Sequence, residues 1–290
     1  MAIDLHTHSF VSDGEFSPEE VVAMAHKKGL SAVAVCDHDS LEGARRALKA
    51  GVELGILVVP AVEISTSYRG KVLHLLAYSI DLENKQLEEK LIDIARYRKE
   101  RAVSIVENIN KELVLEKKPL LEVEPILALG AEKPITRADI AQYLVDKGYV
   151  ANRNEAFVKW LDRFNIPNKD LELKDAIALV HGARGVAVLA HPNGRTLSLR
   201  MLSEDLEQHA LFIEEMASWG LDGVEVYRYN QSQEDENWYC ALTVRLGLLA
   251  TGGSDFHGPS HLLAAPSVGE NKVDDFVLVE LERVATKRAV

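Results

Sequence analysis

The sequence predicts an α/β protein built on a seven-stranded barrel, related to the eight-stranded β/α type but short by one unit. Three observations support this prediction. Short apolar runs alternate with helical patterns along most of the chain, which is typical of a parallel sheet covered by helices. The first helical stretches carry clear start and stop signals. One long helical segment, residues 82–172, interrupts the alternation.

The expected strands are seven apolar runs, most of them rich in Val, Ile, Leu or Ala. Several begin just after a glycine. Parallel strands read as nearly continuous apolar runs because helices bury both faces of the sheet. In chain order the runs are residues 2–6, 31–38, 55–63, 71–78, 185–191, 222–227 and 247–255.

Capping signals predict a helix after each of the first two strands. Ser17 can cap the first helix, Glu20 completes a capping box, and Gly29 can end the helix. The segment from Ser40 to Gly51 repeats this plan.

Residues 82–172 contain no convincing strand and are expected to form a helical insertion between the fourth and fifth strands. Segments 1–81 and 173–290 should form the barrel, and the insertion should cover its active-site face. The helices expected in the insertion are residues 90–113, 135–148 and 154–164.

Composition limits the classes of function. The formal net charge of −12 argues against a general nucleic-acid coat protein, because the phosphate backbone would be repelled. No apolar run approaches the ~20 residues of a membrane helix, and the start of the chain does not resemble a secretory signal. Cys36 and Cys240 lie far apart and match no thiolate metal spacing. These features favour a cytoplasmic protein that has no membrane segment and no obligate protein partner.

Polar side chains recur at or near the ends of the expected strands. Alternation places Asp4, His6 and His8 on one face of the first strand. Ile3 and Leu5 take the other face, which is expected to meet the surrounding helices. The polar face is expected to look into the barrel.

Later strands repeat this placement, and strand ends converge on the active-site face of a β/α barrel. Crowded carboxylates repel and buried imidazoles need partners, so the set would be costly without bound cations. Imidazole and carboxylate ligands suit Mn, Fe or Zn. The further members are Asp13 after the first strand, His38, Glu63, His74 and His191 in the second to fifth strands, and Asp255 with His257 in the seventh; His261 follows in a loop.

These motifs resemble the PHP family, named for its polymerase and histidinol phosphatase members. The resemblance is to its branch of small nucleotide phosphatases and RNA-end-trimming exonucleases, and it implies a distorted seven-stranded β/α, TIM-like barrel with three divalent metal ions. The matching motifs follow the family's order: LHTHS with SDG (residues 5–9 and 12–14), CDHDS (36–40), AVEIS (61–65), VLHLLAY (72–78), LAHP (189–192) and GSDFH (253–257).

The resemblance also implies a ligand set for each of the three ions (Mn, Fe or Zn). All nine residues picked out at the strand ends are used, and none is left over. The first metal would take His6, His8, Glu63 and Asp255; the second would take Glu63 as a bridge, His74 and His191; the third would take Asp13, His38 and His257.

The expected reaction is hydrolysis of a nucleotide phosphomonoester by a hydroxide shared between two cations. Glu63, Asp255 and Arg137 are the expected catalytic residues, and Arg137 and Arg195 the expected substrate contacts. The branch usually carries Arg-x-His in the insertion, whereas this chain has Asp139 in place of the histidine. Asp139 also suits a helix capping box.

The first expected substrate is a nucleoside 3′,5′-bisphosphate, and the second is a nucleoside monophosphate. The alternatives are a 5′-to-3′ exoribonuclease that trims short RNA and a non-catalytic metal-binding PHP module. An amidohydrolase, whose barrel also opens with His-x-His, typically has a metal-bridging lysine. Glu63 occupies that place here, which disfavours the amidohydrolase interpretation.

Overall fold

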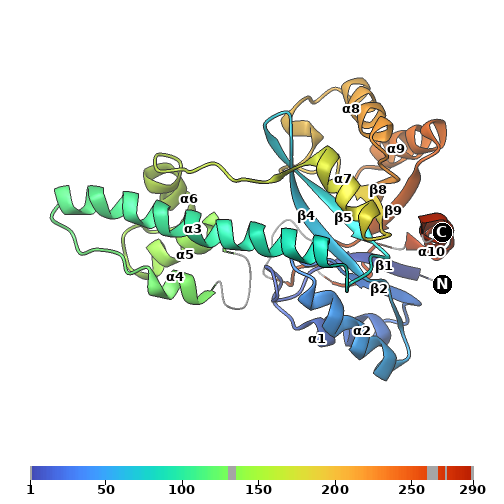
Figure 1. Cartoon of the computed structure of the whole chain (residues 1–290), viewed down its shortest axis with the longest axis horizontal. Coiled ribbons are helices and arrows are strands. Elements are labelled where there is room, and N and C mark those ends of the chain that lie inside the picture. Colours follow the sequence, from blue (N-terminus) through green and yellow to red (C-terminus); the bar gives the residue numbers. More distant parts are fainter. Residues whose placement is uncertain (1, 130–134, 260–266, 272, 289–290) are drawn as a thin grey trace. The chain divides into compact units, whose positions relative to one another are not determined.

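The computed structural model describes residues 2–129, 135–259, 267–271 and 273–288. The chain divides into two compact units (Figure 1). The first unit comprises Met1–Glu89 and Asp170–Val290, and it contains both β-sheets. The second unit comprises Lys90–Lys169 and is helical in its described part.

The first unit has a mixed α/β fold, as predicted. Its four-stranded sheet has the order β10-β1-β2-β3, and its six-stranded sheet has the order β6-β4-β5-β7-β8-β9. Two isolated bridges, Thr7 with Phe256 and His38 with Glu63, link the sheets. The strands are β1 (Ala2–Thr7), β2 (Ala32–Val35), β3 (Leu57–Val58), β4 (Ala61–Tyr68), β5 (Lys71–Tyr78), β6 (Leu171–Glu172), β7 (Val186–Leu189), β8 (Gly223–Arg228), β9 (Leu249–Gly253) and β10 (Val273–Asp274).

Helices pack on the outside of these strands (Figure 1). Ser17 caps α1 with the predicted capping box to Glu20. The helices of the first unit are α1 (Pro18–Lys27), α2 (Glu42–Leu54), α7 (Leu173–Gly182), the short 3-10 helix η2 (Leu199–Met201), α8 (Leu206–Ser218), α9 (Gln233–Leu246) and α10 (Phe276–Arg288). None of the helices in the described ranges has the length and apolar character needed to cross a membrane.

The predicted boundaries of the second helix are wrong. It ends at Gly55, whose φ of 72° is in the left-handed region that glycine favours, and Gly51 lies inside it. A Cβ on Gly51 would lie 2.5 Å from a methyl of Val58, so this glycine allows the helix to approach the strand closely. Leu41, not Ser40, occupies the N-cap position, and its side chain makes no capping hydrogen bond.

The expectation of parallel strands separated by helices is wrong for the middle of the six-stranded sheet. β5 pairs antiparallel with both β4 and β7. A tight turn at Arg69 and Gly70 joins β4 to β5, and both residues have positive φ (50° and 74°), as the commonest hairpin turns require. The single strand expected over 55–63 is split into β3 and β4 at Pro60, which has no N–H for the ladder.

A β-bulge interrupts the pairing of β1 with β2. Asp4 pairs with Val33 and Thr7 pairs with Val35, so two residues of β1 oppose one residue of β2 between these pairs. Such an extra residue changes the face to which the following side chains point. Asp4 and His6 therefore do not share a face, contrary to the simple alternation of the sequence.

The same bulge makes the prediction for Ile3 and Leu5 wrong, because both lie in the inner apolar cluster with the alanines of β2. The Asp4 carboxylate instead accepts hydrogen bonds from the backbone N–H of Ser254 at 2.8 Å and of Gly269 at 2.6 Å. In β2, by contrast, the valines pack with α1 and α2.

The second unit has an apolar core between its helices. Trp160 is its largest fully buried side chain, and it packs with residues such as Ile105 and Leu144. The three expected helices are present, whereas α4 and the two-residue strand β6 were not expected. The elements are α3 (Lys85–Leu115), which begins in the first unit, then α4 (Glu124–Leu129), α5 (Arg137–Asp146), α6 (Arg153–Ala156) and the π-helical turn η1 (Phe157–Leu161).

Candidate metal centre

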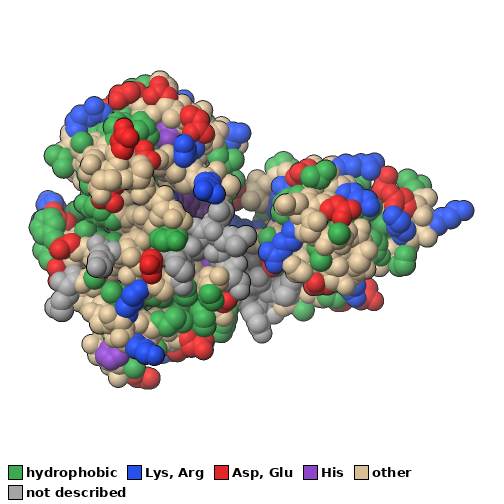
Figure 2. All heavy atoms as spheres, turned by 180° about the vertical axis from the view of Figure 1, so that it is seen from behind, with side chains coloured by type: hydrophobic (Ala, Val, Ile, Leu, Met, Phe, Trp, Pro, Cys, Tyr) green, Lys and Arg blue, Asp and Glu red, His purple; other side chains and the backbone are tan. Residues whose placement is uncertain are grey.

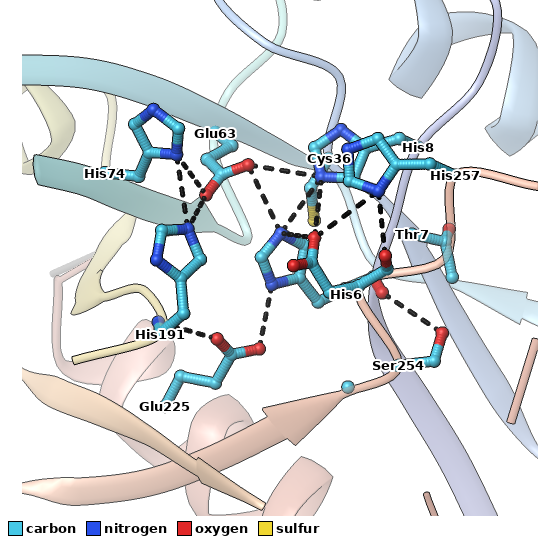
Figure 3. A network of polar contacts seen from close by, with 12 residues as sticks. His6, Thr7, His8, Cys36, Glu63, His74, His191, Glu225, Ser254 and His257 are labelled. Carbon is cyan, nitrogen blue, oxygen red and sulfur yellow. Dashed lines mark hydrogen bonds and ion pairs between the residues drawn. The ribbon is translucent and has the colours of Figure 1, made fainter. Parts of the chain in front are cut away.

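Glu63 lies at the centre of a buried polar cluster in the first unit (Figure 3). It is 1% exposed, and its two carboxylate oxygens face five imidazoles. The distances are 2.9 Å to His191 Nε2, 3.1 Å to His74 Nδ1, and 3.2 Å each to His6 Nε2, His8 Nε2 and His38 Nδ1.

The β4–β5 hairpin brings Glu63 and His74 together. Ser65 pairs directly with His74, and Glu63 pairs with Leu76. Residues opposite each other in an antiparallel pair share a face, so Glu63 and His74 are diagonal neighbours on one face. These two residues therefore come together through antiparallel pairing. The convergence of parallel strand ends, which the sequence suggested, does not explain their proximity.

A second group surrounds Asp13 in the loop after β1. Asp13 lies 3.3 Å from His257 Nε2, 3.7 Å from His38 Nε2 and 3.8 Å from His8 Nδ1. The loop is held by the buried carboxylate of Asp37, which accepts hydrogen bonds from Ser9 and Ser12.

Asp255 completes the cluster from the end of β9. Its Oδ1 lies 3.4 Å from both His6 Nε2 and His8 Nε2. Asp255 and His191 have positive φ, 55° and 29°, which is uncommon for residues other than glycine and concentrates at functional sites. A Cβ on Gly253 would lie 2.4 Å from the backbone nitrogen of His6, so only glycine lets β9 approach β1 this closely.

All nine predicted ligands thus meet in one network, although their grouping differs in part from the expected sets. His261 lies outside the described residues. His191 contacts Glu63, and Asp255 contacts His6 and His8. Three groups of described residues have ligand atoms within 4.8 Å of one another: His8, Asp13, His38 and His257; His6, His8 and Glu63; His38, Glu63 and His74.

The electrostatics of the protein itself keep the carboxylates ionised. Burial would raise the pKa of Glu63, but the imidazoles of His74, His6 and His38 lower it well below its ordinary value. The same balance between burial and neighbouring imidazoles lowers the pKa of Asp13 and of Asp255 well below their ordinary values. Three ionised carboxylates in one cluster offer anionic ligands to cations.

The imidazoles differ from one another in their affinity for protons. Burial would lower the pKa of His8, but hydrogen bonds to Asp255 and Glu63 raise it to about 10. Burial lowers the pKa of His38 to about 3. The imidazoles therefore differ in proton affinity, because His8 faces two carboxylates whereas burial dominates at His38.

These residues fit a group of divalent cations. The Nδ1 atoms of His8 and His38 are buried without a hydrogen-bond partner, and His6 Nε2 faces His8 Nε2 at 3.1 Å. Ring nitrogens arranged in this way are satisfied by a shared metal ion better than by one another. Cys36 is adjacent, but its thiol donates to the Leu5 carbonyl at 3.2 Å.

Glu225 is a site residue that the sequence analysis missed. It is fully buried in β8; its Oε1 lies 2.8 Å from His6 Nδ1, and its Oε2 accepts from the His191 N–H at 2.8 Å (Figure 3). A carboxylate that accepts from Nδ1–H fixes the tautomer and leaves Nε2 free as a ligand. A lone acid inside the apolar run GVEVY was the available signal.

A cavity of about 490 Å³ opens above the cluster. Figure 2 shows histidine side chains recessed in a hollow, with basic side-chain atoms beside them. Arg195, an expected substrate contact, lines this cavity together with Arg200 and Arg228. The metal-centre residues in its lining are Asp13, His38, Glu63, His74, His191, Asp255 and His257.

Arg137 lies in the second unit at the start of α5. Its guanidinium pairs with Asp162 and lies over the Phe157 ring, 4.8 Å from the ring centre, while its Nε is buried without a hydrogen-bond partner. Asp139 forms the predicted capping box with Thr136.

A recessed cluster of imidazoles and carboxylates at one end of an α/β fold defines a class of hydrolases that use divalent cations. The PHP domain pattern matches residues 4–176, and the chain belongs to the PHP family, as the motifs predicted. A 5′-3′ exoribonuclease of Haemophilus influenzae is 32% identical over 88% of this chain and 90% of its own. A 3′,5′-nucleoside bisphosphate phosphatase of Chromobacterium violaceum is 31% identical over 89% of this chain and 87% of its own.

Two solved structures have folds similar to that of this chain. A structure described as a predicted metal-dependent phosphoesterase from Bifidobacterium adolescentis has a TM-score of 0.80 and 30% identity, covering 97% of this chain and 96% of its own. A structure named as an amidohydrolase from Chromobacterium violaceum, with bound sulfate and no metal, has a TM-score of 0.77 and 28% identity, covering 98% and 97%.

Proposed function

We propose that this protein is a divalent-cation-dependent phosphatase that hydrolyses a phosphomonoester of a nucleotide. The first proposed substrate is a nucleoside 3′,5′-bisphosphate, and the second is a nucleoside monophosphate. The observation that carries the proposal is the convergence of six imidazoles and three carboxylates, seven of which line a cavity whose wall also carries arginines. Such a cavity suits a small dianion attached to an organic group.

The proposed ligand assignment follows the family's order. His6, His8, Glu63 and Asp255 would hold the first cation; Glu63, His74 and His191 the second; and Asp13, His38 and His257 the third. Divalent cations held in this way lower the pKa of bound water and stabilise negative charge on phosphoryl oxygens.

The protein's own groups orient this centre and bind the substrate. Glu63 is placed between two groups of imidazoles, so its two oxygens can serve two cations at once. Glu225 holds His6 in the tautomer whose Nε2 faces the cluster. Arg195, on the cavity wall, is proposed to bind a substrate phosphate, and Arg137 is proposed as a further phosphate contact from the second unit.

The main alternative is a 5′-to-3′ exoribonuclease that trims short RNA. The relative in Haemophilus influenzae bears that name, and its identity to this chain is about that of the phosphatase relative. Both reactions need the same cation centre, and they differ in the length of substrate that the cavity accepts. An amidohydrolase is disfavoured because the bridging place holds Glu63 where a lysine would be expected.

Substrate assays separate these functions. Phosphate release from pAp and AMP should be compared with the shortening of a 5′-phosphorylated RNA, using protein loaded with manganese. We expect rapid phosphate release from pAp, and its near-complete loss in His191→Ala with retained folding. His26→Ala, an exposed histidine in α1, is the matched control. Efficient RNA shortening with inert pAp would favour the exoribonuclease, and a folded protein inactive on all substrates would favour a non-catalytic module.

A further inference from the structure

We propose that Arg228 is a substrate-binding residue of this centre, and that its guanidinium donates hydrogen bonds to the oxygens of the phosphate held there. This inference rests on the proposed function and deepens it. Arg228 is the last residue of β8, and its side chain is 13% exposed. It lines the same cavity as Glu63, His191 and Asp255.

A second β-bulge aims Arg228 at the cavity. Residues 225 and 228 of a regular strand would point to opposite faces, because the side-chain period is two. In β8, however, Glu225 pairs with Thr251 while Tyr227 pairs with the next residue, Gly252. The extra residue in β8 puts Arg228 on the same face as Glu225, which is the face of the metal centre.

The carboxylates of Glu225 and Asp255 attract the Arg228 guanidinium by charge, but they do not accept hydrogen bonds from it. Arg228 Nε lies 3.2 Å from Glu225 Oε2 but forms no hydrogen bond with it, and Nη2 lies 3.6 Å from Asp255 Oδ2, beyond hydrogen-bond distance. A guanidinium carries five N–H donors in a planar fork that matches phosphate geometry. Arg228 is therefore fixed in place while donors stay available for an anion in the cavity.

The other two arginines of the cavity differ from Arg228 in their contacts. Arg200 pairs with Glu204, whose Oε2 lies 2.9 Å from both Nε and Nη2 of the guanidinium. Arg195 is exposed and forms no ion pair within the described part of the chain. Among the three, Arg228 alone contacts a carboxylate of the metal centre in the described part of the chain. This ion pair places the Arg228 guanidinium beside the metal centre, where the proposed function puts the scissile phosphate.

Binding of inorganic phosphate to the manganese-loaded protein tests this inference directly. Titration calorimetry should show that Arg228→Met weakens phosphate binding about 10- to 100-fold, the loss expected for charge-assisted hydrogen bonds. Arg228→Lys should keep part of the affinity, because it retains the charge but not the fork. The matched control is Arg245→Met, which removes an exposed arginine paired with Glu214.

The manganese content of each variant decides what the loss means. Equal manganese content with weakened phosphate binding supports the inference. Unchanged phosphate affinity in Arg228→Met overturns it, and so does a loss that follows the loss of manganese, since Arg228 would then only support Asp255.

Nucleotide turnover separates this inference from the proposed function. Wild-type hydrolysis of pAp with an unchanged KM in Arg228→Met would overturn the role of Arg228 and leave the phosphatase intact. Phosphate binding that depends on Arg228 in a protein that hydrolyses no nucleotide would support the anion contact and overturn the proposed function.

Discussion

The metal centre of the first unit and the apolar core of the second bury very different side chains. The metal centre gathers six imidazoles and three carboxylates, most of them buried, with ring nitrogens that face each other or lack a partner. The second unit buries mainly aliphatic and aromatic side chains around Trp160. Its buried Arg101 donates to the Ile166 carbonyl and to Asn165.

This difference shows which part of the chain is built for stability and which for function. A helical core follows local rules of periodicity and capping, so each part of the sequence supports the same structure. The metal centre breaks these rules, because like charges and unpaired nitrogens are buried together. Bound cations would remove that conflict, so we expect the folded state of the first unit to be linked to cations and that of the second unit not to be.

Replacing Glu63 should have the largest effect. Glu63→Gln keeps the shape but removes the charge that faces five imidazoles, and we expect phosphate release from pAp to fall by at least about 10³-fold. Elemental analysis should show loss of manganese. The control is Glu53→Gln on the exposed face of α2, which should retain both. Full activity in Glu63→Gln would contradict the central role of this carboxylate.

The residues of this cluster could be predicted from the sequence, but part of the geometry that brings them together could not. Imidazoles and carboxylates in the order of the family's motifs mark these positions directly. The bulges in β1 and β8 could not be foreseen, because an extra residue in a strand depends on its pairing with a neighbour. The β4–β5 hairpin does have a signal in the sequence, because Gly70 stands between two apolar runs and can adopt the positive φ that a tight turn requires.

Truncating Trp160 should have the next largest effect and should be confined to the second unit. Trp160→Ala removes the largest buried side chain of that core. We expect it to lower the free energy of unfolding of the second unit by about 3–5 kcal/mol. Hydrogen exchange on the full chain should show faster exchange in α3 and α5, with unchanged manganese content. Val158→Ala is the control, because Val158 is 79% exposed in the same turn. Loss of manganese in Trp160→Ala would show that the two units depend on each other.

Glu225 tests the boundary between folding and function within the first unit. Glu225→Gln keeps the size of the side chain but removes the negative charge beside His6 and Arg228. Removing such a supporting carboxylate typically weakens metal binding about 10- to 100-fold. A manganese titration of chelator-treated protein measures this change, with Glu234→Gln in the first turn of α9 as the control. Unaltered manganese affinity would mean that His6 is oriented without Glu225.

The smallest expected effect is at the capping box of α5. The Thr136 hydroxyl accepts from the Asp139 N–H at 3.3 Å, and the Asp139 carboxylate accepts from the Thr136 N–H at 2.8 Å. Thr136→Ala should destabilise the second unit by about 1 kcal/mol in urea unfolding, and Thr136→Ser should restore most of it.

Asp139 stands where the family branch usually has a histidine, so this cap bears on function too. If Thr136→Ala costs the expected amount, Asp139 has a structural reason to be an acid in this chain, independent of any substrate. If Thr136→Ala leaves the stability unchanged, the packing of Ile140 and Leu144 is enough to hold α5 without the cap. The presence of Asp139 would then need a different explanation. In that case Asp139→His should leave urea unfolding unchanged and alter the KM for pAp.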